Sequence, residues 1–182
     1  MDVAEAQRDV RDTFRGGFAG QLVSGMLWLA SAAVGTWGTP RAAIGLLVVG
    51  GFFIFPLTRL VLRGLGGASS LRPGNPLNAL GMQVAFVLPL TLPLVAAAAL
   101  YRLNWFYPAF MIALGAHYLP FAFLYGMRLF WALAAILLVG GVLVGLYHQE
   151  TFALGAWLTG AVLLCFAVLG LQAVQRESPP LD

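Results

Sequence analysis

Leu129 to Tyr147 reads LFWALAAILLVGGVLVGLY, an unbroken apolar run without a charged side chain. A hydrocarbon layer about 30 Å thick needs about 20 apolar residues for one helical crossing, so this stretch has the length and composition of a membrane span. The run is continuous and does not alternate between polar and apolar residues, which favours a helix over a barrel strand.

The region without acidic residues extends far beyond this run, because no Asp or Glu occurs between Thr13 and Gln149. The chain has 182 residues, of which 60% are hydrophobic and 9% charged, and its mean hydropathy is +0.88. A soluble domain of this size has too little interior to hide so much apolar surface. We therefore expect an all-α integral membrane protein.

Arg, Pro, Gly and Asn residues divide the chain into six apolar runs, which we interpret as six transmembrane helices. The predicted spans lie near 18–36, 42–62, 77–101, 105–125, 129–147 and 152–174. Together they form a transmembrane bundle over residues 17–174. A short amphipathic helix at 1–16, lying on the cytoplasmic surface, precedes the bundle, and a cytoplasmic tail at 175–182 follows it.

All ten basic residues are arginines, and their distribution predicts the orientation. Arg41 and Arg102 fall on one side of the predicted bundle. The other eight fall on the side shared by both termini: Arg8, Arg11, Arg15, Arg59, Arg63, Arg72, Arg128 and Arg176. Basic flanks stay in the cytoplasm, so we expect both termini on the inner side of the inner (plasma) membrane. Arg59 lies within the second span, near its inner end, where its stem can reach the headgroups.

The composition argues against most catalytic chemistry. Carboxylate relays and acid–base pairs need acidic side chains, which the spans lack. His117, His148 and Cys165 are too few for a convincing zinc site in one chain, because such sites take three or four protein ligands. We expect Cys165 to be a small buried filler. No enzyme activity, cofactor, metal site or nucleic-acid partner is expected.

Prolines concentrate in the middle of the predicted bundle. Pro89 and Pro93 lie in the third span, Pro108 and Pro120 in the fourth, and Pro56 in the second. Each proline removes a backbone donor and is expected to bend its helix. The carbonyl groups released in this way need partners, which is why broken membrane helices often line cavities. We predict a cavity at the third and fourth spans.

Polar side chains within the spans are the candidate ligand contacts. An imidazole deep in a membrane span costs free energy unless it has a partner, so His117 is the first candidate. The alternative is a neutral histidine bonded to a backbone carbonyl near a proline. The full set of candidate ligand-binding residues is His117, Tyr118, Gln83, Gln21 and Asn78. Interhelical hydrogen bonds are the alternative role for the amide side chains.

Small residues four positions apart favour close helix contacts in lipid. Such pairs are Gly16 with Gly20, Ser31 with Gly35, Gly141 with Gly145, and Ala156 with Gly160. They can serve packing within one chain, and a homodimer through the fifth and sixth predicted helices is the functional alternative.

The stretch Gly-Ala-His-Tyr-Leu-Pro at 115–120, together with Phe-Pro-Leu at 55–57 and Trp28, resembles a domain-of-unknown-function family of small bacterial multi-pass membrane proteins. The resemblance extends over most of the chain. It implies the six-helix architecture and adds no chemistry.

Two functions from different classes remain. The first is a bundle that binds or transports a small apolar or aromatic molecule, or a membrane lipid, in the cavity predicted at the third and fourth spans, with His117, Tyr118 and Gln83 as polar contacts. The second is an accessory subunit whose apolar faces serve a larger membrane complex. An enzyme acting on a lipid is a more distant third.

Overall fold

The computed structural model describes residues 1–66 and 70–177, and every regular element in this part of the chain is helical. The predicted tail beyond 177 lies outside the described residues. The elements are α1 (Val3–Thr13), η1 (Arg15–Gly17), α2 (Phe18–Trp37), α3 (Pro40–Gly51), α4 (Ile54–Gly64), α5 (Leu77–Tyr101), η2 (Leu103–Trp105), α6 (Phe106–Tyr125), α7 (Leu129–Tyr147) and α8 (Leu154–Glu177).

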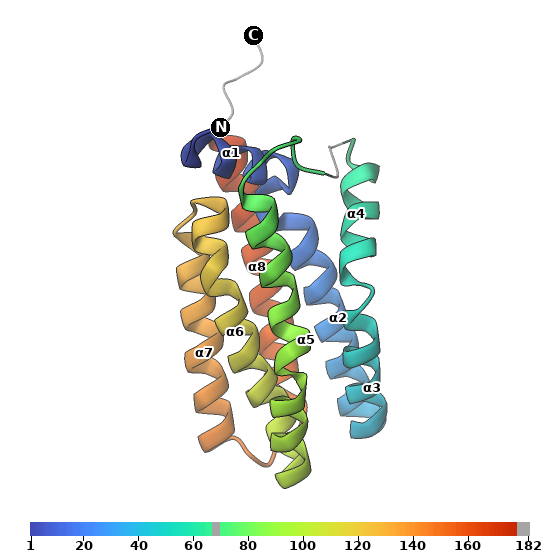
Figure 1. Ribbon diagram of the computed structural model, residues 1–182. Coiled ribbons are helices and arrows are strands. Elements are labelled where there is room, and N and C mark those ends of the chain that lie inside the picture. Colours follow the sequence, from blue (N-terminus) through green and yellow to red (C-terminus); the bar gives the residue numbers. More distant parts are fainter. Residues whose placement is uncertain (67–69, 178–182) are drawn as a thin grey trace.

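The long helices run side by side, and α1 lies across one end of them (Figure 1). We call this end, where α8 also finishes, the α1 end of the bundle. The helices α2, α5, α6, α7 and α8 are each long and apolar enough to cross a membrane. The bent pair α3 and α4 makes a sixth candidate span. This architecture is compatible with a multi-pass membrane protein.

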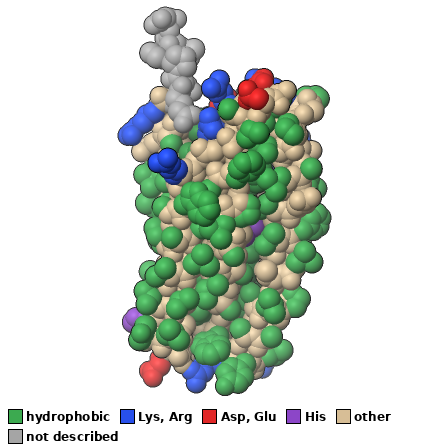
Figure 2. Space-filling view, turned by 60° about the vertical axis from the view of Figure 1, so that its left-hand side comes forward, with side chains coloured by type: hydrophobic (Ala, Val, Ile, Leu, Met, Phe, Trp, Pro, Cys, Tyr) green, Lys and Arg blue, Asp and Glu red, His purple; other side chains and the backbone are tan. Residues whose placement is uncertain are grey.

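The surface agrees with that architecture. On the face shown in Figure 2, charged side chains gather at the two ends of the molecule, and hydrophobic side chains cover most of the surface between them. Cys165 corrects one expectation, because it lies in the middle of α8 and is exposed on this apolar surface, not buried as a filler.

The second predicted span is not one straight helix. It divides into α3 and α4, which are bent by 60° relative to each other at a short break. The break contains Phe52 and Phe53, and Pro56 follows in the first turn of α4. A proline cannot donate to the carbonyl four residues earlier and its ring clashes with that group, which is the carbonyl of Phe52. The position of Pro56 therefore explains why the helix is broken at Phe52 and Phe53.

Four helices form the centre of the bundle. The α6 helix packs along α7 and the α2 helix along α8, with further contacts joining α8 to α6 and α7. The other two spans are attached from outside, α5 on α6 and the α3–α4 pair on α2. The buried core includes Trp28, Tyr107 and Phe130, each at most 2% exposed.

The α1 helix is more than a surface helix, because it caps the bundle through specific bonds. Its buried face consists of Ala6, Asp9, Val10 and Thr13, whereas Val3 is exposed. Gln7 Nε2 donates to the carbonyl of Phe123 at 2.6 Å, and Arg11 Nη1 donates to that of Tyr125 at 2.7 Å. These carbonyls belong to the last turn of α6, whose C-terminal carbonyl groups have no partner inside the helix. The α1 helix thus provides hydrogen-bond donors for the carbonyl groups at the C-terminal end of α6.

Candidate functional site

A groove between α5 and the α3–α4 pair is the candidate site. Its floor comes from α2 and α6, and its cavity volume is about 90 Å³. The lining residues are Ser24, Trp28, Leu47, Val48, Gly51, Phe52, Ile54, Leu88, Pro89, Leu92, Phe110 and Leu114. Because α5 packs on α6 while α3 and α4 pack on α2, the groove lies between two spans that have little contact with each other.

Two sequence features keep this space open. On one side, the α3–α4 break turns the backbone, and Gly51 carries no side chain to fill the gap; a Cβ built there would meet nothing within 4 Å. On the other side, Pro89 lies inside α5. Since a proline has no N–H, the carbonyl of Ala85 one turn earlier has no helical donor. The sequence predicted a cavity at the third and fourth spans, whereas this groove opens between the second and third spans, and the fourth span contributes Phe110 and Leu114 to its floor.

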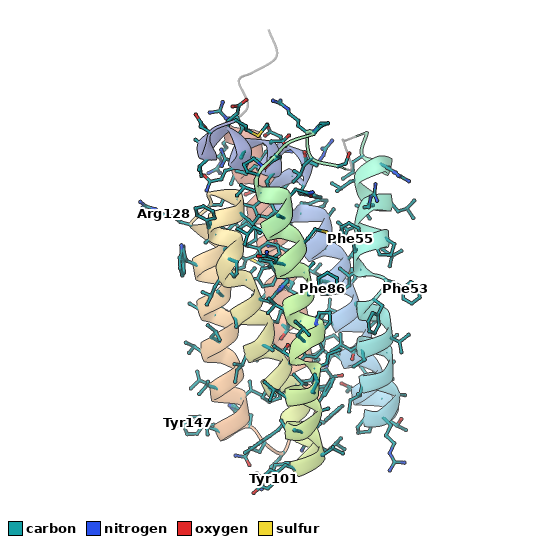
Figure 3. The ribbon with its side chains drawn as sticks, in the orientation of Figure 1. Phe53, Phe55, Phe86, Tyr101, Arg128 and Tyr147 are labelled. Atoms are coloured by element: carbon teal, nitrogen blue, oxygen red, sulfur yellow. The ribbon has the colours of Figure 1, made fainter. Side chains whose placement is uncertain are left out.

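The chemistry of the groove is almost entirely apolar. Ser24, buried at 6% exposure, and the indole N–H of Trp28 are its polar side-chain groups. Exposed aromatic rings lie next to it. Phe55 on α4 and Phe86 on α5 lie on the facing sides of the two helices (Figure 3), and both are more than half exposed. No acidic or basic side chain lines the groove, and the Ser24 hydroxyl is its nucleophilic group.

His117 and Tyr118 lie in a different place, within an aromatic cluster of α6 and α7. The His117 ring is 5.0 Å from that of Phe121, and the Tyr118 ring stacks 6.1 Å from that of Phe130. The imidazole lies near the backbone of Val84 on α5. Its Nδ1 is buried without a partner among the described residues. Neither His117 nor Tyr118 lines the groove.

The amide side chains of the candidate set are dispersed. Gln21 is 2% exposed, and neither its Nε2 nor its Oε1 has a partner among the described residues. Its Nε2 lies beside Gly17, whose nearest neighbours include the Phe130 ring. Gln83 and Asn78 are exposed on α5. The structure therefore does not bring Gln83 to His117, although the neighbouring Val84 reaches it.

The five prolines have different positions in their helices. Pro89 and Pro93 lie inside α5 and Pro120 inside α6, and both helices continue through them. Pro56 follows the α3–α4 break. Pro108 lies in the first turn of α6, where the N–H it lacks would have no helical partner anyway. Helix geometry therefore requires no bend at Pro108, and the kinks expected at Pro89, Pro93, Pro108 and Pro120 stay predictions.

The small-residue pairs are used inside the chain. A Cβ on Gly141 would lie 2.9 Å from the carbonyl oxygen of Pro108, and one on Gly160 would lie 3.1 Å from that of Gly25. Gly16 packs in the same way on Gly170. Any homodimer would therefore have to use other surfaces of the fifth and sixth predicted helices.

A larger depression of about 210 Å³ lies between α6 and α7, away from the α1 end. It is open to the surroundings and lined by Trp105, Pro108, Ala109, Ile112, Gly141, Val142, Gly145 and Leu146. Gly141 and Gly145 line it on α7, and both pack against Pro108 of α6.

A hydrogen-bonded cluster at the α1 end was not anticipated from the sequence. Asn75 Nδ2 donates to Asp9 Oδ2 at 2.7 Å, and the backbone N–H of Arg72 donates to the same oxygen at 3.1 Å. The Arg72 side chain adds an ion pair at 3.5 Å. The sequence feature that could have indicated this cluster is the position of Asp9 on the same face of the first helix as the apolar residues Ala6 and Val10.

The family comparison covers nearly all of this architecture. A family model described as "Family of unknown function (DUF7010)" matches residues 3–173, from the first turn of α1 almost to the end of α8. The chain belongs to the DUF7010 family. No curated protein and no solved structure matches this DUF7010 protein, so its activity has to be argued from the geometry above.

Proposed function

We propose that this protein is a multi-pass membrane protein of the inner membrane that binds the hydrocarbon chain of a membrane lipid in the groove between α5 and α3–α4. The observation that carries the proposal is the position of the groove. It is apolar and lies near the middle of α5, between two spans that do not close over it. Such a site is accessible from the bilayer itself, where lipid chains are the most abundant apolar molecules.

The size of the groove favours a slender chain over a bulky aromatic molecule. Pockets for drug-sized ligands have volumes of about 300–1,000 Å³, whereas this groove has about 90 Å³. The position of α1 across the end of the bundle also favours a membrane lipid as the ligand. Gln7 and Arg11 bond to the last turn of α6, which covers the α1 end, so entry from the side is favoured over a path along the bundle axis.

Membrane insertion can be tested through Cys165, the single cysteine of the chain. Its position in the middle of α8, on the apolar surface, places it in the hydrocarbon layer if the proposal is right. We expect a charged, water-soluble thiol reagent to leave it unmodified in intact nanodiscs and to label it after denaturation in SDS. Arg102→Cys in a Cys165→Ser background should be labelled without denaturation.

Rapid labelling of Cys165 in nanodiscs would contradict insertion of α8. The proposed orientation, with the α1 end in the cytoplasm, rests on the positive-inside rule. A reporter fused after Asp182 and active only outside the cytoplasm would contradict that orientation.

The groove can be filled without disturbing the protein. Gly51 lies one turn after Leu47 on α3, and both line the groove, so a side chain at 51 would project into it. A Cβ there meets nothing within 4 Å. We expect Gly51→Leu to fold normally and to lose most of the phospholipid that the detergent-purified wild type retains in native mass spectrometry.

Gly45→Leu is the matched control, because Gly45 also lies on α3 with nothing within 4 Å of its Cβ position and does not line the groove. It should retain lipid as the wild type does.

His117→Leu separates this proposal from the hypothesis of a ligand at His117. Loss of lipid in His117→Leu, with retention in Gly51→Leu, would move the site to the aromatic cluster and overturn the groove.

The accessory-subunit hypothesis has one observation in its favour. The outward face of α5 is exposed along its whole length, including Leu90, Leu94 and Leu100. In lipid this face needs no protein partner, since lipid tails are as apolar as leucine. A partner that copurifies stoichiometrically, and is lost when polar residues replace Leu90 and Leu94, would favour the accessory role over lipid binding.

A further inference from the structure

We propose that the lipid held in the groove is anionic and that Arg59 binds its phosphate. This inference rests on the proposed function and names the lipid class for the same site. It starts from a basic residue whose one contact among the described residues is with an aromatic ring. Arg59 lies on α4, one turn beyond Phe55 toward the α1 end, with its guanidinium carbon 5.9 Å from the centre of the Phe55 ring.

The Nε atom of Arg59 is not satisfied by the part of the chain that the structure describes. Its Nε is buried and has no hydrogen-bond partner, and no hydrogen bond or ion pair involves this side chain among residues 1–66 and 70–177. A buried guanidinium donor without an acceptor is costly. An acceptor from outside the protein would remove this cost, and phosphate oxygens match the donor geometry of arginine closely.

Two other arginines near this end of the α4 and α5 helices are already engaged. Arg15 Nη2 donates to the carbonyl of Leu65 at 2.8 Å, and Arg72 pairs with Asp9. Arg63 is exposed at the end of α4. Among these four arginines, Arg59 is the one whose Nε is buried without a hydrogen-bond partner in the described residues.

The position of Arg59 relative to the groove fits a lipid. Phe55, its ring partner, lies on the side of α4 that faces α5 (Figure 3). Arg59 is five residues beyond Ile54, which lines the groove, so the rise along the helix is about 7–8 Å toward the α1 end. A chain lying in the groove would therefore have its polar end near Arg59, at the level where arginine stems reach the headgroups.

Asn78 supplies a second donor on the opposite wall. It precedes Pro89 by about three helical turns on α5, which places the two residues on nearly the same face, and Pro89 lines the groove. Asn78 is exposed at the α1 end of α5. One of the residues singled out from the sequence thus lies where a headgroup would be, although not beside His117.

The test uses the full chain in detergent, with phosphatidylglycerol and phosphatidylcholine added in equal amounts and bound lipid counted by native mass spectrometry. We expect the wild type to prefer phosphatidylglycerol by about tenfold, the size of one charge-assisted hydrogen bond. Arg59→Gln should lose this preference while still retaining phosphatidylcholine. Arg59→Lys should keep part of the preference, and Arg63→Gln, on the same helix, should keep all of it.

Each alternative outcome overturns a defined statement. An unchanged preference in Arg59→Gln, or an equal loss of both lipids, would rule out the phosphate contact. Displacement of phosphatidylglycerol by millimolar inorganic phosphate would indicate a free-phosphate site. If Gly51→Leu kept both lipids while Arg59→Gln lost the preference, the groove would be wrong and the phosphate contact right. A wild type that retains neither lipid would overturn both proposals.

Discussion

Replacing Gly170 by alanine should lower the free energy of unfolding by about 1–3 kcal/mol, the usual cost of adding a methyl group to a packed contact. A Cβ on Gly170 would lie 2.6 Å from the carbonyl oxygen of Gly16. Backbone oxygen cannot move aside as a flexible side chain can. Gly16 is also held at φ +64° in the left-handed turn between α1 and α2, so the turn would have to shift as a whole.

The measurement is the unfolding midpoint in a fixed detergent, monitored by the helical circular dichroism signal. Gly45→Ala is the control, because Gly45 lies in the helix α3 with nothing within 4 Å of its Cβ position. That change should be neutral or stabilising by up to about 1 kcal/mol, as expected from helix propensity. Equal midpoints for the two variants would mean that α8 does not contact the α1–α2 turn as the structure has it.

The positions of the long helices could be predicted, because apolar runs of membrane-spanning length are visible in the sequence. Runs such as Leu77–Tyr101 and Leu129–Tyr147 have the same bounds as α5 and α7, since the charged and small residues that end them are visible in the sequence. The break at Phe52 and Phe53 was harder to predict from the sequence. Pro56 predicted a bend, but a bend and a division into two helices have the same local signal.

The candidate site could be predicted less well, because α5, α6 and α7 are apolar on all sides. In an amphipathic helix the apolar stripe identifies the face toward the core, and here no such stripe exists. Gln83 was expected to face inward as the polar residue of its turn, yet Val84 is buried and Gln83 is exposed. Gln21, by contrast, is buried. Which face of α5 meets α6 depends on long-range packing that sequence periodicity does not encode.

Replacing Asp9 by alanine should release α1 from the bundle without unfolding the spans. Asp9 is 5% exposed and accepts from Asn75 Nδ2 at 2.7 Å and from the Arg72 N–H at 3.1 Å. Leaving buried donors unpaired costs about 1–3 kcal/mol. We discount the ion pair with Arg72, because that side chain is 67% exposed and water replaces most of the interaction.

Hydrogen exchange in detergent measures this local opening directly. Amides of α1 should exchange about tenfold faster or more in Asp9→Ala, since every 1.4 kcal/mol corresponds to a factor of ten, whereas those of α7 should not change. Asp12→Ala, at an exposed position of the same helix, is the control and should exchange as the wild type does.

Asn75→Ala should reproduce much of the effect, because Asn75 Nδ2 also donates to the carbonyl of Ala6 at 3.2 Å. If Asp9 and Asn75 hold α1 through one shared contact, the double variant should lose less than the sum of the two single changes; strict additivity would mean that the two residues act separately.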